Sequence, residues 1–102
     1  MKNYVLGSGA LADLEEIRDF IAQDNPVAAD RWIEKLFETF DALGKAPGIG
    51  HRREDLTGFP VLFFPVDAYV VIYRIAQEQV EIVAVTQGAR DVPSFLNRRE
   101  MF

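Results

Sequence analysis

The first half of the chain repeats its apolar residues with the spacing of amphipathic helices. In the segment 8–25 one helical face collects apolar side chains, namely Leu11, Leu14, Ile17, Phe20 and Ile21. Ser8 stands just before this face and predicts an N-cap, and the acidic residues early in the segment suit the positive end of a helix. The opposite face is expected to be solvated, and its carboxylates are Asp13, Glu15, Glu16 and Asp19.

A second helix is predicted almost immediately after the first. Asn25 can cap this helix, Pro26 occupies its first position, and Gly44 ends the pattern. Its apolar stripe, widened by two aromatic residues, comprises Ala29, Ile33, Leu36, Phe40 and Leu43 with Trp32 and Phe37. Because the link between the two helices is so short, the sequence predicts an antiparallel helical hairpin.

The second half of the chain changes to a strand-like pattern. Three segments rich in Val, Ile, Phe and Tyr are separated by short polar or proline-marked links; they are 59–65, 68–76 and 80–86. The link 77–79 predicts a tight hairpin, and the segment 80–86 is apolar on both faces, which predicts a central strand. A short strand at 4–6 and a helical turn after Asp91 complete the order β-α-α-β-β-β. The predicted fold is an α/β (α+β) arrangement, with the helical hairpin packed on a small, mainly antiparallel sheet.

Length and composition favour one folded domain, residues 1–102, inside the cell. The chain has 102 residues and a hydrophobic fraction of 49%, enough for a single core. It has no cysteine, which excludes disulfides and thiolate chemistry and suits the cytoplasm. The most apolar segment, 59–73, is interrupted by Pro60, Pro65 and Asp67 and is too broken to span a membrane. A net charge of -5 argues against direct nucleic-acid binding by the whole surface.

The sequence offers little material for catalysis. It lacks a glycine-rich phosphate loop, neither serine lies in a nucleophile elbow, and His51 is the only histidine. We therefore expect no catalytic residue, metal or cofactor. The second half does collect arginines that are candidates for contacting a target: Arg52, Arg53, Arg74, Arg90, Arg98 and Arg99. For Arg90 the alternative is an ion pair with Asp91 or Glu54 that stabilises the strand end.

Four pieces of the chain occur together in one known family. They are the first-helix piece beginning "DLEEI", the link "LGKAPGIGHRREDL", the strand "YVVIYRI" and the closing "GARD". In this order and spacing, over about residues 10–96, the sequence resembles the ParE-type toxins of the ParE/RelE superfamily, which belong to type II toxin–antitoxin systems. The resemblance implies the RelE-like fold, which agrees with the element order predicted from the pattern.

The resemblance also implies partners. Toxins of this family are produced with a small antitoxin, often of the ParD kind, whose flexible C-terminal part wraps the toxin in a heteromeric complex. ParE proteins are described as poisons of DNA gyrase. Aromatic residues of the second helix and of the following strand are candidates for antitoxin contact, namely Trp32, Phe37, Phe40, Tyr69 and Tyr73.

RelE relatives instead cut messenger RNA on the ribosome, and the residues disfavour that activity here. At the position where the RelE pattern has a basic residue this chain has Pro65, and where it has a tyrosine this chain has Phe95 and Leu96. Arg90 retains the closing arginine, but Gln87 stands where many relatives have a histidine. A gyrase inhibitor that acts by recognition is the leading hypothesis, and the segment 92–102, expected to be exposed, is the first candidate for the contact.

Two alternatives stay open. The first is a messenger-RNA endoribonuclease, ribosome-dependent or free, in which four arginines bind phosphate and donate a proton: Arg52, Arg53, Arg74 and Arg90. The second is a relative that binds an antitoxin but has lost its toxicity.

Overall fold

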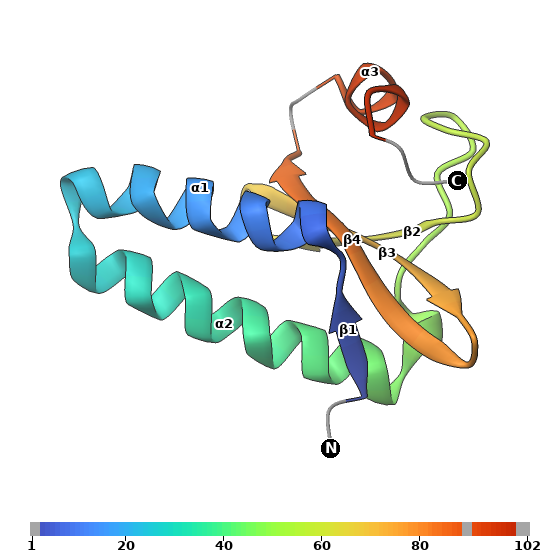
Figure 1. Cartoon of the computed structure of the whole chain (residues 1–102), viewed down its shortest axis with the longest axis horizontal. Helices are drawn as coiled ribbons and strands as arrows, with labels where there is room; N and C mark the ends of the chain where they lie inside the picture. The colour runs from blue at the N-terminus through green and yellow to red at the C-terminus, as the bar shows by residue number, and fades with distance from the viewer. Residues whose placement is uncertain (1–2, 89–90, 100–102) are drawn as a thin grey trace.

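A helical hairpin lies across one face of a four-stranded sheet in the computed structural model, which describes residues 3–88 and 91–99 (Figure 1). The elements run in the predicted order: β1 (Tyr4–Leu6), α1 (Ser8–Asp24), α2 (Pro26–Lys45), a 3-10 turn η1 (Pro47–Ile49), β2 (Leu62–Val66), β3 (Tyr69–Ala76), β4 (Gln79–Gln87) and α3 (Val92–Asn97). The mixed α and β composition and the order β-α-α-β-β-β are confirmed.

The sheet has the strand order β1-β4-β3-β2, so β3 and β4 are interior. For β4 the two apolar faces of segment 80–86 predict this position. Only the β1–β4 pair is parallel, which confirms a mainly antiparallel sheet. Gln77 and Glu78 connect β3 to β4 with φ values of 53° and 62°. Two positive φ values in a two-residue loop match the type I′ turn, whose twist suits a hairpin.

A bulge in β4 determines which of its side chains face each layer. Tyr73 pairs with Ile82 and Ile72 pairs with Ala84, which leaves Val83 without a partner in β3. An extra residue on one strand puts two successive side chains on the same side of the sheet. Val83 and Ala84 therefore both join the cluster beneath α3, whereas Ile82 joins the cluster beneath the hairpin.

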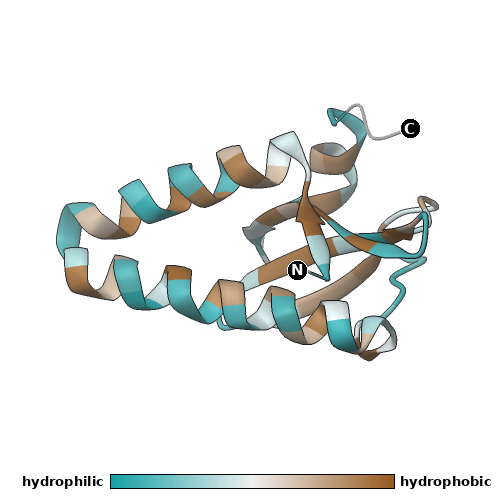
Figure 2. Cartoon of the chain, turned by 60° about the horizontal axis from the view of Figure 1, so that its bottom comes forward, coloured by the Kyte–Doolittle hydropathy of each residue, from teal (hydrophilic) through white to brown (hydrophobic). Residues whose placement is uncertain are grey.

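Two apolar clusters share the sheet. The larger lies between the hairpin and the sheet, and it includes Leu14, Trp32, Leu36, Phe40, Leu43, Val71, Tyr73, Ile82 and Val85. The smaller lies on the other face under α3 and the loop before β2, and it includes Val61, Phe63, Ile72, Val83, Ala84, Val92, Phe95 and Leu96. Figure 2 shows apolar residues recurring along both helices of the hairpin. Most residues of the apolar stripes predicted from the helical spacing thus pack against the sheet or the other helix.

The details of α1 differ from the prediction. Gly7, not Ser8, is the N-cap, no side chain caps this end, and the first turn holds no acidic residue. Leu11 and Phe20 are 50% and 63% exposed, although the pattern placed them on the inner face. Asp13 is only 9% exposed, although the pattern placed it in solvent. The reason is that Asp13 accepts a hydrogen bond from the backbone N–H of Val85, which turns this part of the helix toward β4.

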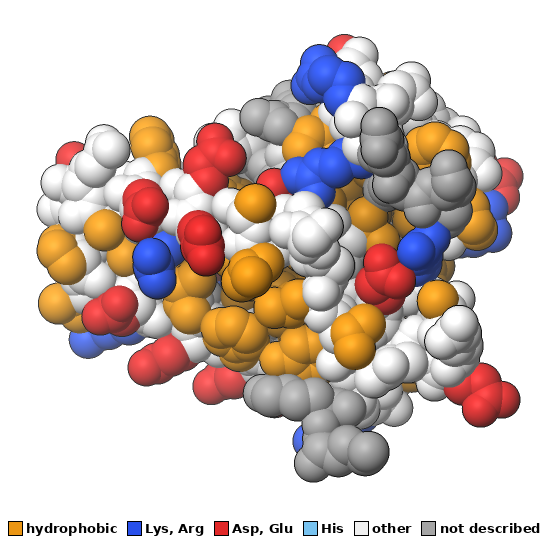
Figure 3. Space-filling view, in the orientation of Figure 1, with side chains coloured by type: hydrophobic (Ala, Val, Ile, Leu, Met, Phe, Trp, Pro, Cys, Tyr) orange, Lys and Arg blue, Asp and Glu red, His pale blue; other side chains and the backbone are white. Residues whose placement is uncertain are grey.

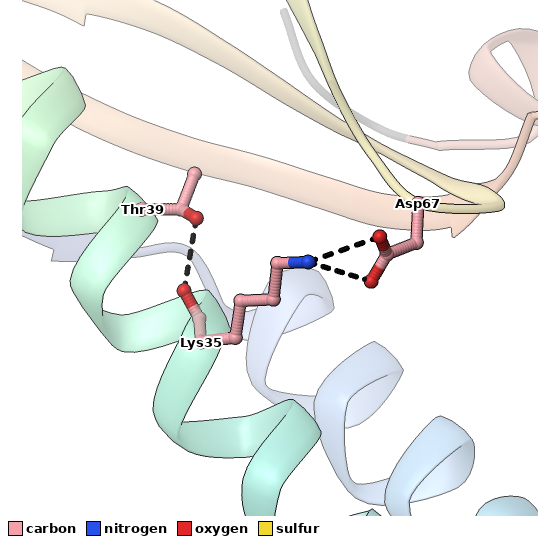
Figure 4. A network of polar contacts seen from close by, with 3 residues as sticks. All are labelled: Lys35, Thr39 and Asp67. Carbon is pink, nitrogen blue, oxygen red and sulfur yellow. Dashed lines mark hydrogen bonds and ion pairs between the residues drawn. The ribbon is translucent and has the colours of Figure 1, made fainter.

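The start of α2 agrees with the prediction. The side chain of Asn25 accepts a hydrogen bond from the backbone N–H of Ala28 at 3.0 Å, and a proline follows the cap. The helix continues one residue beyond Gly44. Lys35 of α2 places its Nζ 2.9 Å from both carboxylate oxygens of Asp67, in the turn between β2 and β3, and Thr39 donates to the Lys35 carbonyl (Figure 4). Because Lys35 and Asp67 are exposed, this pair contributes little to stability but marks where the hairpin meets the strands.

Candidate functional site

Three of the six candidate arginines converge on one pocket. Arg74 comes from β3, and Arg98 and Arg99 directly follow α3. The pocket has a volume of about 420 Å³, and the rest of its lining is Gly7, Ser8, Gly9, Glu81 and Val83. Figure 3 shows Lys and Arg side chains around α3 and the nearby sheet, whereas many acidic side chains lie over the hairpin. We call this site the arginine pocket; it brings together residues 90 positions apart in a chain of net negative charge.

Two of these arginines are held by carboxylates. Arg74 and Glu81 are directly opposite each other on β3 and β4, and their side chains form an ion pair at 3.2 Å. Arg99 donates to the carboxylate of Asp13 and, at 3.3 Å, to the carbonyl of Val83. The guanidinium of Arg99 also lies 4.5 Å from the centre of the Phe95 ring. Both guanidiniums are therefore fixed in position at the wall of the pocket.

Beyond the end of β1, the side chains of Asp13 and Arg99 form hydrogen bonds with the backbone of β4, where a neighbouring strand would otherwise pair. β1 pairs with β4 only as far as Ile82, and the next outward-facing groups of β4 are the carbonyl of Val83 and the N–H of Val85. These two side chains satisfy those groups, which would otherwise form an open sheet edge. Burial raises the pKa of Asp13 above its ordinary value, an effect opposed by the hydrogen bonds from Val85 and Arg99.

The other arginines lie elsewhere. Arg52 and Arg53 stand on the exposed loop before β2, where Arg53 donates two hydrogen bonds to Asp55 and Arg52 lies 3.8 Å from Glu54. The contact with Arg53 holds the pKa of Asp55 below its ordinary value. Arg90 lies outside the described residues, so its predicted roles stay predictions.

Asp91, proposed above as a partner of Arg90, caps α3. Its carboxylate accepts from the hydroxyl of Ser94 at 2.8 Å and from the Ser94 backbone N–H at 3.3 Å. These hydrogen bonds to the charged form lower the pKa of Asp91.

Two candidates for antitoxin contact are core residues. Phe40 and Tyr73 have no exposed surface. The hydroxyl of Tyr73 donates to the carbonyl of Pro47 at 2.6 Å and accepts from the N–H of Gly50 at 2.9 Å. A partner cannot reach either side chain without opening the core, so their assignment to a binding surface is corrected. Helical spacing marked Phe40 as apolar but does not distinguish a core position from a docking position.

The remaining aromatic candidates lie nearer the surface. Trp32 is 8% exposed and meets Tyr69 edge to face at 5.1 Å between ring centres. Phe37 and Tyr69 are half-buried. Tyr69 lines a second pocket of about 450 Å³ between α1 and the end of β4, and we call this space the acidic groove. Its described lining is Asp13, Glu16, Ile17, Asp19, Phe20, Gln23, Tyr69, Val85, Thr86, Gln87 and Phe95.

Phe20 is the residue that the sequence analysis missed as a surface group. It is the most exposed large apolar side chain of the described residues and stands beside the carboxylates of Glu16 and Asp19 in the acidic groove. The signal was present in the sequence, because the apolar face of α1 is wider than one contact with the sheet requires. An exposed aromatic ring among carboxylates is typical of a surface for an amphipathic, basic segment.

A third pocket, of about 320 Å³, contains the position where a RelE-like nuclease has a basic residue. Pro65 lines it, together with His51, Arg53, Tyr69 and Val70. Phe95 and Leu96 are apolar residues of α3 that are buried against the sheet, so neither of them supplies the polar group of a tyrosine. The Tyr73 hydroxyl is occupied in the core, and burial raises its pKa. The lining also includes Asp67, so it holds four groups that could bind phosphate or transfer a proton. Two of them are already paired, Arg53 with Asp55 and Asp67 with Lys35, which leaves His51 and Tyr69.

The C-terminal segment is less exposed than predicted. Val92, Phe95 and Leu96 are 4%, 6% and 0% exposed, because α3 covers the second apolar cluster of the sheet. In the described part of this segment, the side chains of Asn97 and Arg98 are exposed. No described helix has the length and apolar character needed to cross a membrane. Across residues 3–88 and 91–99, no group of three or more His, Asp or Glu side chains is placed to hold a metal ion.

This arrangement defines a class. A similar overall fold occurs in the solved structure described as the chromosomal ParDE toxin–antitoxin system from P. aeruginosa. The match has a TM-score of 0.70 at 18% identity and covers 85% of this chain and 96% of that one. At this identity the likeness shows the fold alone.

The sequence comparisons give the family. Residues 4–92 match the profile of the ParE toxin of the type II toxin–antitoxin system parDE, and the chain belongs to this family. The chain is 38% identical to toxin RelE2 of Caulobacter vibrioides over 81 residues, which are 79% of this chain and 89% of the relative. It is 28% identical to toxin RelE3 of the same organism over 85 residues, 83% of this chain and 92% of the relative. The chain is thus a type II toxin of the ParE/RelE superfamily.

Proposed function

We propose that this toxin inhibits DNA gyrase by binding and acts in the cytoplasm. The observation that carries the proposal is that Pro65 stands in the third pocket in place of a basic residue, while Phe95, outside this pocket, is a buried core residue. Cleavage of RNA without a metal needs a base, a cation and an acid around one phosphate, and in this lining the cation of Arg53 is already paired with Asp55 and the carboxylate of Asp67 with Lys35. Recognition of a protein target needs no such set, and membership of the ParE family favours gyrase as that target.

We propose further that a ParD-like antitoxin neutralises the toxin at the acidic groove. An amphipathic helix or extended segment with basic residues would place an apolar side chain against Phe20 and its cations near Glu16 and Asp19. Coupled folding of such a segment commonly buries on the order of 1,000–3,000 Å².

The test is plasmid supercoiling by purified gyrase and ATP, with and without the toxin. We expect lost supercoiling and accumulation of linear DNA from trapped cleavage. Adding the cognate antitoxin should restore supercoiling, and toxin inactivated by heat is the control. Unchanged supercoiling at large molar excess of folded toxin would contradict the gyrase proposal and leave the family assignment standing.

Ribonuclease activity is the second candidate, because two relatives carry the name RelE. Primer extension on messenger RNA isolated after induction of the toxin tests it. New 5′ ends that are missing when an antitoxin is co-produced would support cleavage. If the RNA stays intact while growth stops, the nuclease hypothesis is rejected.

A further inference from the structure

The start of α1 collects positive groups, whereas helices ordinarily have acidic groups at this end. The N-cap, Gly7, has no side chain to accept a hydrogen bond from the first N–H groups, and the first turn contains no acidic residue. The arginine pocket opens onto these N–H groups, and three guanidiniums line it against one carboxylate, that of Glu81. At the described lining residues, the positive potential of the helix N-terminus and the positive charge of the guanidiniums therefore reinforce each other.

Close packing holds the cations against this helix end. A Cβ at Gly9 would overlap the Nη1 atom of Arg99, so glycine allows the guanidinium to lie on the first turn of α1. Asp13 offsets the charge of Arg99, and Glu81 offsets that of Arg74. Arg98 is exposed and forms no close ion pair with a described residue, although the carboxylate of Asp91, outside the pocket lining, is near enough to interact with its charge. The exposed guanidinium of Arg98 and the uncapped N–H groups thus remain accessible to a ligand across the described pocket.

We propose that the arginine pocket binds a phosphate group. A guanidinium offers paired N–H donors with the spacing of phosphate oxygens, and uncapped helix N–H groups add further donors. The volume of about 420 Å³ leaves room for a phosphate that belongs to a larger molecule, such as the backbone of DNA. Binding to this pocket requires neither gyrase nor an antitoxin, so it is separate from the function proposed above.

The experiment follows the backbone amides of Ser8 and Gly9 by NMR in the full chain at low salt. The probes are inorganic phosphate and a short DNA duplex of mixed sequence. We expect saturable shifts of both amides, with little change at the acidic groove. Arg98→Glu should weaken binding about tenfold or more, as expected for loss of one charge-assisted contact. Arg98→Gln should weaken it less, because it removes the charge without reversing it.

Arg31→Glu is the matched control, because Arg31 is exposed on α2 and the substitution changes the net charge equally. We expect an effect of at most about twofold, since salt screens distant surface charges. Amides of Ser8 and Gly9 that do not shift, or equal weakening by Arg98→Glu and Arg31→Glu, would overturn the proposal. Tighter, strongly salt-dependent binding of the duplex assigns the site to a nucleic-acid backbone. Equal affinity for inorganic phosphate assigns it to a free phosphate.

Discussion

Arg99 donates to the carboxylate of Asp13 across 86 residues of sequence, and this contact joins the segment after α3 to the first helix. The same two side chains satisfy the Val83 carbonyl and the Val85 N–H of β4. A single ion pair thus caps the open edge of the central strand, holds the end of α3 and shapes one wall of the arginine pocket.

Loss of Arg99 should destabilise the fold more than loss of an exposed arginine. Arg99→Ala leaves the Asp13 carboxylate largely buried without its cation, and we expect a loss of about 2 kcal/mol in the free energy of unfolding. Arg18→Ala, which breaks the exposed pair with Asp19, should change this free energy by less than about 0.5 kcal/mol. Urea denaturation of both variants measures the difference, and equal effects would show that the Asp13–Arg99 pair adds nothing to stability.

Tyr73→Phe should destabilise the chain by about 1–3 kcal/mol, the cost of leaving buried polar groups unsatisfied. The substitution removes only a hydroxyl, but that hydroxyl accepts from the Gly50 N–H and donates to the Pro47 carbonyl. Tyr69→Phe is the control, because the Tyr69 hydroxyl makes no hydrogen bond to a described residue. Thermal denaturation compares the two, and similar midpoints would contradict a structural role for the Tyr73 hydroxyl.

The two helix caps should differ in their contribution. Asn25→Ala removes the acceptor for the Ala28 N–H and should cost about 1 kcal/mol of stability. Ser8→Ala should change stability by only about a few tenths of a kcal/mol, because Gly7 occupies the cap and Ser8 supplies no capping bond. Chemical denaturation of the two single variants tests this. A larger loss in Ser8→Ala than in Asn25→Ala would place the cap of α1 at the serine.

Asp13 and Asp91 should titrate on opposite sides of the ordinary aspartate value of 3.8. The pKa of Asp13 is raised by burial, so the folded state binds the proton more tightly and this group's contribution to stability falls as pH rises through its folded pKa. The pKa of Asp91 is lowered by its hydrogen bonds to Ser94, so its contribution is present above 3.8 and is lost as pH falls through its folded pKa.

Carboxyl-carbon NMR across acidic pH measures both values directly. Ser94→Ala removes the hydroxyl that donates to Asp91 and should move the pKa of Asp91 back toward 3.8, while that of Asp13 stays in place. The assignment of these causes fails if Asp91 keeps its low pKa in Ser94→Ala, or if Asp13 titrates below 3.8.

Phe20→Ser should weaken antitoxin binding about tenfold or more if the acidic groove is the docking site proposed above, since exposed aromatic anchors dominate such interfaces. Because Phe20 is 63% exposed, stability should hardly change. Ile75→Ser is the matched control, because Ile75 is also exposed and does not line the acidic groove. Calorimetric titration with the antitoxin measures both, and equal affinities would place the antitoxin elsewhere.

The elements and their order could be predicted from local pattern, because helical spacing, Pro26 after Asn25 and alternating β-branched residues act over a few neighbours. The central position of segment 80–86 could also be predicted, because both of its faces are apolar. The bulge at Val83 could not be predicted, because it depends on the pairing of β4 with β3.

The sites depended on the tertiary structure. Arg74, Arg98 and Arg99 were candidates by residue type, but only folding brings the end of α3 beside β3 and the start of α1. The sequence alone determined the family and the layered fold, through motifs and periodicities that are local. The tertiary structure decided that Asp13 is buried and Phe20 exposed, because a helix of fixed pattern can be rotated by one strong contact, here with the Val85 N–H.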